Sequence, residues 1–196
     1  MENLNFGIDR NNDIKTISDS NTKCIHCRRP GQYSVLPDNR ESDVEVYVCG
    51  YCFHYYRMNE LSDNDRIIFT SSLQPKWISH LQKAIQTAKQ SGSKEKIAQA
   101  EKLETWLFAH AKFVADSQWG TSSPVAIDAA VERTLPNKRK LVFSELGLAL
   151  SESTFESSDS VTRHTSPPTN SWKEHFVQFK KLILTAEAKG QGSNNA

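Results

Sequence analysis

The segment from Cys24 to Cys52 decides the fold of this chain, because it contains all four cysteines in two closely spaced pairs. The first pair is Cys24-Ile25-His26-Cys27 and the second is Cys49-Gly50-Tyr51-Cys52. Two residues between the cysteines let both sulfur atoms of a pair face one metal ion from a tight turn, called a zinc knuckle. The pairs are separated by 21 residues, 28–48, close to the roughly 15–20 residues typical of paired-knuckle sites.

Four thiolates at this spacing predict a structural zinc site. Sulfur ligands at ~2.3 Å would complete a tetrahedral shell around Zn²⁺ and leave no position open for water. Thiolates are soft ligands, and zinc imposes no coordination geometry of its own. Two disulfides or four unrelated buried thiols are the alternatives. Disulfides need an oxidising compartment, which nothing in the sequence indicates, so the spacing favours Zn²⁺ bound by Cys24, Cys27, Cys49 and Cys52.

The composition of the 196 residues fits one domain with appendages or two small domains. Apolar residues make up only 37% of the chain, so we expect part of it not to pack into a core. The 24 basic and 23 acidic residues give a net charge of +1, which provides no overall attraction toward nucleic acid or anionic lipid. The polar N-terminal residues contain no apolar segment typical of a secretory signal, and no run approaches the ~20 apolar residues of a membrane span. We therefore expect a cytoplasmic protein, unless a partner holds it at a membrane.

The residues around the cysteines predict a hairpin followed by a helix. Residues 1–22 are polar with scattered apolar positions, and they form either a loose strand or a disordered segment. Residues 32–36 and 44–48 predict two strands joined by a turn, and residues 53–61 predict a short helix. A knuckle, a hairpin and a helix that begins at the second knuckle form, in that order, a treble clef. The metal would hold the helix start against the hairpin in a unit spanning residues 23–70, which compensates for a small core.

After a strand at residues 66–70, the sequence predicts a mostly helical region over residues 71–150. Pro75 and an apolar stripe predict one helix ending near Gly92, and a second helix runs from about residue 94 to 117. We expect these two helices to pack as an antiparallel hairpin that supplies most of the core. A third helix over residues 125–135 is stopped by Pro136, and a basic cluster follows at residues 138–140. The predicted fold class is α+β, a small four-cysteine zinc treble clef with a helical region packed on it.

The last part of the chain predicts a linker and a separate helix. Residues 151–170 are dense in Ser and Thr and contain Pro167-Pro168, which favours a flexible linker. A capping box begins an amphipathic helix over residues 171–189, and residues 190–196 form a polar tail. An aromatic-rich helix on a tether either packs back on its own domain or docks on a partner. The candidate partner-binding residues on it are Trp172, Phe176, Phe179 and Ile183.

Three parts of the chain together resemble the DotN/IcmJ family of type IVB secretion and conjugation systems. The first is the pair of knuckles, and the second is the strand and helix start Ile67-Ile68-Phe69-Thr70-Ser71-Ser72-Leu73-Gln74. The third is Trp119-Gly120-Thr121-Ser122-Ser123-Pro124, which is similar to an aromatic-Gly…Thr-Ser-x-Pro turn of that family. Knuckles alone occur in many unrelated families. Their order and spacing relative to this turn carry the resemblance, which covers roughly residues 20–135.

The resemblance implies a zinc-bound, HNH-like fold that is related to HNH nucleases but has no established catalysis. It also implies an adaptor in a coupling complex, held at the cytoplasmic side of the inner membrane through its partners. There it would bind the coupling ATPase, which feeds substrates into the secretion channel, together with other coupling-complex subunits. The chain departs from the family pattern in its short N-terminal region and in the Ser-rich stretch before its last helix.

Two alternative functions follow from the zinc unit. An HNH nuclease needs a His general base on the hairpin between the knuckles, and no histidine lies between Cys27 and Cys49, so we expect no nuclease activity. Nucleic-acid binding is the stronger alternative, because treble clefs often bind DNA or RNA. The basic residues around the knuckles are Lys23, Arg28, Arg29 and Arg57. However, a zinc tetrathiolate carries a formal charge of about −2 and attracts cations without any nucleic acid.

Overall fold

The computed structural model describes residues 4–11, 13–17, 21–38, 43–70 and 73–158. The chain divides after residue 163 into two units, and all described residues belong to the first. The predicted helix over residues 171–189 and the polar tail therefore lie outside the described residues. So do the candidate partner-binding residues Trp172, Phe176, Phe179 and Ile183.

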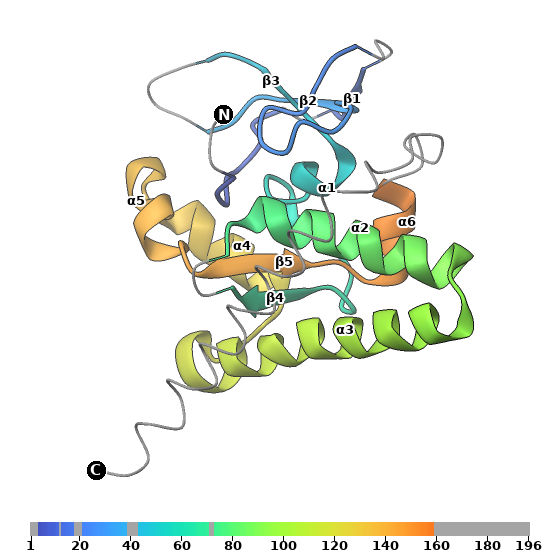
Figure 1. The fold of residues 1–196 in the computed structure, drawn as a ribbon. Coiled ribbons are helices and arrows are strands. Elements are labelled where there is room, and N and C mark those ends of the chain that lie inside the picture. The colour runs from blue at the N-terminus through green and yellow to red at the C-terminus, as the bar shows by residue number, and fades with distance from the viewer. Residues whose placement is uncertain (1–3, 12, 18–20, 39–42, 71–72, 159–196) are drawn as a thin grey trace. The chain divides into compact units, whose positions relative to one another are not determined.

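The described residues form the predicted α+β fold, with two small antiparallel sheets and helices around them (Figure 1). Most elements are short, and the two longest helices follow one another in the middle of the chain. In chain order the elements are β1 (Lys15–Thr16), β2 (Tyr33–Val35), β3 (Val46–Val48), α1 (Gly50–Phe53), the 3₁₀ helix η1 (Met58–Glu60), β4 (Arg66–Phe69), α2 (Pro75–Ser91), α3 (Lys94–Phe113), the π-helix η2 (Val114–Trp119), α4 (Pro124–Arg133), α5 (Pro136–Val142), β5 (Leu146–Ala149) and α6 (Glu152–Ser158).

The first sheet contains the predicted hairpin. Its strand order is β1-β2-β3, and in the hairpin Tyr33 pairs with Val48 and Val35 with Val46. Val35 and Val48 are fully buried, which gives this sheet one face toward the core. Residues 1–22 were expected to form either a loose strand or a disordered segment. Part of them forms β1, which joins the sheet, and both Leu4 and Phe6 are buried.

The predicted continuous helix over residues 53–61 is wrong. Helix α1 covers only Gly50–Phe53, and η1 follows after a turn. The N-terminal segment explains the interruption, because the backbone N–H of Gly7 donates to the carbonyl of Tyr55 and that of Asp9 donates to the carbonyl of Tyr56. These two carbonyls would otherwise accept bonds along the helix axis. The helix is therefore shorter than predicted, because its carbonyls bond to the N-terminal segment of the chain.

The second sheet joins segments that are far apart in sequence. Strand β4 confirms the predicted strand, and β5 pairs with it in the register Arg66 with Ala149 and Phe69 with Leu146. All four residues of β5 are buried, and the sheet packs with β5 against α2 and β4 against α3 (Figure 1). Strand β5 was not predicted from the sequence. Pro136 was predicted to stop a helix, but it begins α5, a position where the missing N–H of proline costs nothing.

Helices α2 and α3 form the predicted hairpin, but they do not supply most of the core. Ile78 of α2 and Leu107 of α3 belong to a small cluster that also contains Ile68 of β4. The larger cluster instead includes the four cysteines, the buried residues of the β2–β3 hairpin and residues of α4 and β5. Helix α3 continues into the π-helix η2 and ends at Gly120, whose φ of 69° is the left-handed conformation that favours glycine.

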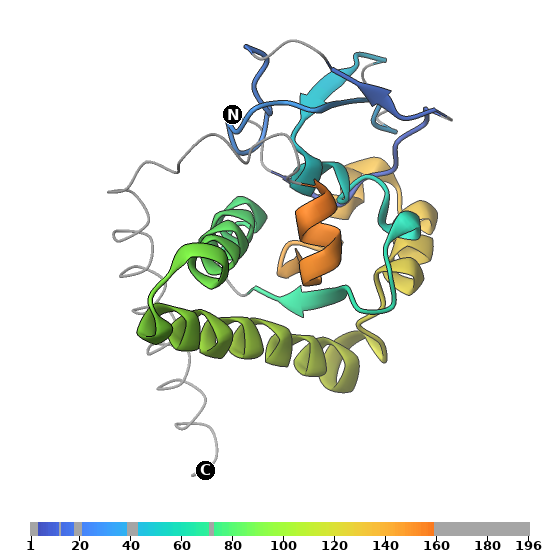
Figure 2. The same ribbon diagram turned by 90° about the vertical axis from the view of Figure 1, so that its right-hand side faces the viewer.

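A helix occupies the first part of the predicted linker. The predicted linker begins at residue 151, but α6 covers Glu152–Ser158 and lies against α1 (Figure 2). Phe155 is buried there, with its ring centroid 6.4 Å from that of Tyr51. The side chain of Phe155 therefore helps to hold this turn of chain against α1. Residues 159–170 of the predicted linker lie outside the described residues.

Candidate metal centre

The fold brings the four cysteines into one buried cluster. Their Sγ atoms all lie within 4.8 Å of one another, and the Sγ atoms of Cys27 and Cys49 are 3.4 Å apart. A tetrahedron with Zn–S bonds of ~2.3 Å has sulfur atoms about 3.8 Å apart, so the cluster has the dimensions of a tetrathiolate site. All four cysteines are free rather than joined in disulfides. The donor set and its spacing are compatible with a metal ion such as zinc.

The first knuckle is shaped by backbone hydrogen bonds within the turn. The N–H of Arg28 donates to the carbonyl of Cys24 at 3.0 Å, and the N–H of Cys24 donates to the carbonyl of Arg29 at 2.7 Å. Arg28 has a φ of 64°, the only left-handed non-glycine residue among those described. A bond of 2.9 Å from the N–H of Ile25 to the carbonyl of Tyr47 joins the knuckle to β3. The turn is therefore fixed against the hairpin by main-chain contacts.

The second knuckle spans the junction of β3 and α1. Cys49 precedes α1, and its carbonyl accepts the N–H of Phe53 at 2.9 Å. The buried side chain of Gln32 accepts the N–H of Gly50 at 2.6 Å, while the Gln32 backbone N–H donates to the carbonyl of Val48. Gln32 thus ties the start of α1 to the end of β3. No motif or spacing in the sequence indicates this role of Gln32.

The four thiols differ in how easily each of them ionises. Hydrogen bonding from Cys24 holds the pKa of the Cys27 thiol well below its usual range, whereas burial raises the pKa of the Cys52 thiol. Several thiolates packed together in a buried site repel one another, so they need a cation at their centre to ionise together. A divalent ion provides that charge, and ligand deprotonation couples its binding to pH.

Aromatic residues connect the metal centre to distant elements. Tyr51 lies between Cys49 and Cys52, and its hydroxyl donates to the carbonyl of Leu148 in β5. The N–H of Leu148 in turn donates to the hydroxyl of Tyr55 at 2.9 Å. The second knuckle is therefore bonded directly to a strand about a hundred residues further along the chain. The pattern of cysteines predicts the knuckle but contains no information about this strand.

Two histidines lie beside the cysteines. The Nε2 atom of His26 lies 2.8 Å from the hydroxyl oxygen of Tyr56, and the two rings stack. Burial lowers the pKa of His54 to about 4, so its imidazole is neutral at pH 7. Neither residue belongs to the hairpin between the knuckles, where an HNH nuclease would carry its general base.

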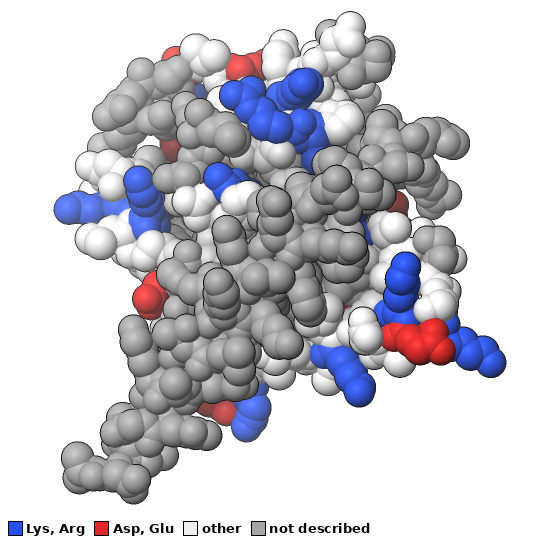
Figure 3. Space-filling model, viewed as in Figure 1, with Lys and Arg blue, Asp and Glu red and all other residues white. Residues whose placement is uncertain are grey.

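Two of the four basic residues that suggested nucleic-acid binding are engaged within the fold. Arg57 is ion-paired with Asp9 and Glu60, and the Arg29 guanidinium lies 5.9 Å from the ring centroid of Tyr51. In the view of Figure 3, the Lys and Arg side chains that are visible stand in separate groups.

The three basic residues at 138–140 are not all exposed to solvent. Arg139 is buried, and it donates to the carbonyls of Val131 and Thr134 and to the carboxylate of Asp38. Lys138 and Lys140 are exposed on either side of it. One of the three charges therefore stabilises the junction of α4 and α5 and is not presented to solvent.

Comparison with protein-family models and with curated proteins finds no match for this chain. The resemblance to the DotN/IcmJ family therefore remains a hypothesis carried by the sequence motifs. Among the described residues, no helix combines the length and apolar character that crossing a membrane requires.

Proposed function

We propose that the four cysteines bind one structural Zn²⁺ ion and that the chain is a non-catalytic adaptor of a type IVB secretion or conjugation coupling complex. The observation that carries the zinc assignment is the closed cluster of four buried sulfur atoms, which leaves no ligand position for substrate or water. A site of this kind stabilises a fold and presents surfaces around it. The coupling ATPase is the proposed partner, and the proposed location is the cytoplasmic side of the inner membrane.

The arrangement of the three resembling segments supports the adaptor proposal. The N–H of Ile67 in β4 donates to the carbonyl of Ser122 at 2.8 Å, so the second and third segments are in direct contact. Ile67 also belongs to the same buried cluster as Cys24 and Cys52. Motifs that are separated in the sequence therefore meet around one centre, as expected if they are parts of a single functional unit.

A purification from the native host tests this function. The tagged chain, isolated without chelator from detergent-solubilised cells, is analysed for metal by mass spectrometry and for co-purifying proteins by peptide identification. We expect one zinc per chain and stable co-purification of a coupling ATPase. Protein without stoichiometric zinc would refute the metal assignment, and a preparation lacking the ATPase would refute the adaptor assignment.

DNA binding separates this proposal from the nucleic-acid alternative. The purified chain is titrated against duplex and single-stranded DNA at several salt concentrations, with Mg²⁺ or Mn²⁺ added to detect cleavage. We expect neither cleavage nor binding in the micromolar range. Binding at micromolar or lower concentration that weakens steeply with salt would favour the alternative.

A further inference from the structure

A cavity of about 340 Å³ lies away from the cysteine cluster, where three parts of the chain meet. They are the N-terminal segment, the start of α2 and the turn between α5 and β5. Its apolar lining comes mainly from Leu4, Phe6, Tyr55, Phe143 and Leu146. The volume is at the lower end for a ligand pocket and suits one or two apolar side chains.

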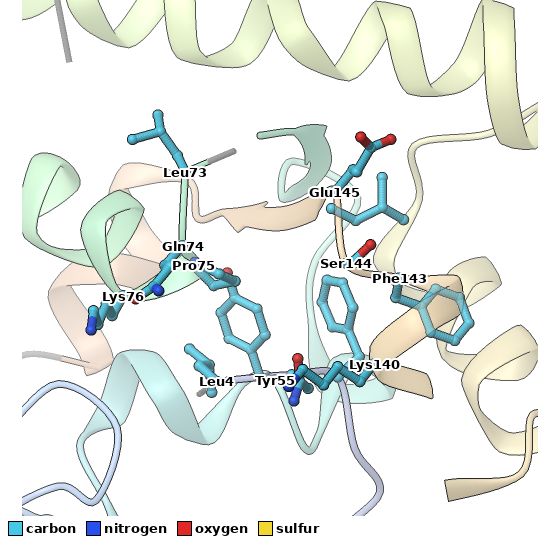
Figure 4. Close-up of a pocket in the computed structure, with 13 residues that line it drawn as sticks. Leu4, Tyr55, Leu73, Gln74, Pro75, Lys76, Lys140, Phe143, Ser144 and Glu145 are labelled. Atoms are coloured by element: carbon cyan, nitrogen blue, oxygen red, sulfur yellow. The ribbon is translucent and has the colours of Figure 1, made fainter. Parts of the chain in front are cut away.

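The charged residues that line this cavity are two lysines and one glutamate, beside three neutral polar residues. Figure 4 shows Lys76, at the start of α2, and Lys140, in α5, with Leu4 and Tyr55 between them. Lys76 lies over the ring of Trp77, and neither lysine forms an ion pair within the described part of the chain. Glu145 is the one carboxylate among the lining residues. A segment that enters between the two lysines would therefore meet a positive field.

Helix α5 also carries two exposed apolar residues that do not line the cavity. Leu141 is 76% exposed and Val142 is 43% exposed, and both directly follow Lys140. Exposed large apolar residues beside an apolar cavity are typical of protein interaction sites. The cavity provides a pocket for an anchoring side chain, and Leu141 and Val142 expose apolar surface elsewhere on the helix that carries Lys140.

We propose that this cavity docks an acidic segment of a partner protein, with a leucine or phenylalanine side chain inserted between Lys76 and Lys140. The partner's carboxylates would pair with the two lysines, and its apolar side chain would be buried against Phe6 and Phe143. The chain's own residues 171–189 are a poorer occupant, because they include four lysines against two glutamates. The inference rests on the proposed function only in assuming that the adaptor has a protein partner.

A peptide selection tests the docking surface without knowing the partner. The full-length, zinc-containing chain is immobilised, and a library of random linear peptides displayed on phage is selected on it. We expect the enriched peptides to combine Asp or Glu with Leu or Phe. Enrichment of basic aromatic peptides would instead indicate a site for a segment like residues 171–189. That result, or enrichment with no charge bias, or no enrichment at all, would overturn the proposal.

Charge-reversal variants then locate the binding site. The best enriched peptide is synthesised with a fluorescent label, and its affinity is measured at physiological salt, where charges separated by more than ~8 Å are screened. We expect Lys76→Glu and Lys140→Glu each to weaken binding about fivefold. Lys138→Glu is the matched control, because Lys138 is exposed on the same helix but does not line the cavity. Equal effects of Lys138→Glu and Lys140→Glu would refute the site.

The remaining controls separate folding and function from docking. Zinc content and thermal unfolding show that each variant is folded. If the selected peptides bind as expected but no coupling ATPase co-purifies, the docking surface stands and the proposed function fails. If the ATPase co-purifies equally with wild type and with the Lys76→Glu/Lys140→Glu double variant, the function stands and this surface is not the one that its partner uses.

Discussion

Replacing the buried carboxylate of Asp65 by an amide should destabilise the protein by loosening α6. Asp65 precedes β4, is fully buried and connects the loop that starts at Ser62 to the beginning of α6. Its Oδ1 atom accepts the N–H of Ser151 at 2.7 Å. Its Oδ2 atom accepts the N–H and the hydroxyl of Ser62, at 2.8 and 2.7 Å, and the hydroxyl of Thr154 at 3.0 Å.

The expected magnitude follows from counting donors that would lose their acceptor in Asp65→Asn. The amide places an NH₂ group either against the N–H of Ser151 or against the N–H of Ser62. One partly buried backbone donor loses its acceptor in both orientations, at a cost of about 1 kcal/mol because water can partly replace the carboxylate. The remaining bonds go to a neutral oxygen and are weaker than bonds to a carboxylate. We therefore expect a loss of about 2 kcal/mol, a substantial part of a typical folding free energy of roughly 5–15 kcal/mol.

Urea unfolding followed by circular dichroism measures this loss, and Asp63→Asn provides the matched control. Asp63 is exposed in the same loop, so its replacement should change stability by less than about 0.5 kcal/mol. Hydrogen exchange adds a local readout, since the amides of α6 should lose protection first in Asp65→Asn. If the two variants unfold at the same urea concentration, the carboxylate of Asp65 does not hold α6 in place.

Three further predictions concern the metal, the pH dependence and one glycine. Cys49→Ser should release the metal and unfold at least the N-terminal half, because such an ion contributes on the order of 10 kcal/mol; a variant with one zinc and the wild-type melting temperature would contradict this. Burial, with a smaller contribution from Glu132, raises the pKa of Asp128 from 3.8 to about 6, so stability should fall as the pH rises through this range. Asp128→Asn should therefore be more stable than wild type at pH 7, by about 1 kcal/mol after allowing for solvent screening, and equal to it near pH 4. Melting curves of both proteins at each pH test this, and a stability difference that stays constant across pH would disprove it. Gly120→Ala should lower the free energy of unfolding by about 1 kcal/mol, because alanine is strained at a φ of 69°, although nothing lies within 4 Å of the added methyl group. Urea unfolding measures this change, and an unchanged midpoint would show that the turn relaxes.

Features encoded by short-range patterns were predictable from the sequence. The spacing within each cysteine pair indicated that the four sulfur atoms would face one centre, and the structure brings them together. The alternation of residues 44–48 indicated β3, and the apolar stripes indicated α2 and α3. Each of these signals lies within one element or one cysteine pair.

Features that depend on distant residues were not predictable in this way. Strand β5 is only four residues long and contains Gly147, so neither its length nor its composition marks it as a strand. It forms because β4 offers an unpaired edge and the hydroxyls of Tyr51 and Tyr55 bond to Leu148. Helix α6 likewise depends on Asp65, and Arg139 is buried because Asp38 and two carbonyls accept its donors. The predicted linker and the predicted basic cluster were both assigned from composition alone.

The pairing of β4 with β5 has a consequence for synthesis of the protein on the ribosome. Paired residues are separated by 77 positions between Phe69 and Leu146 and by 83 between Arg66 and Ala149. Both cysteine pairs emerge long before β5, so if the cysteines bind the proposed Zn²⁺, a nascent chain can do so while the edge of β4 and the hydroxyl of Tyr51 still lack their partners. An exposed strand edge of this kind attracts other chains. Translation that stalls between residues 70 and 145 should therefore leave a metal-bound but aggregation-prone intermediate, one that molecular chaperones would have to protect.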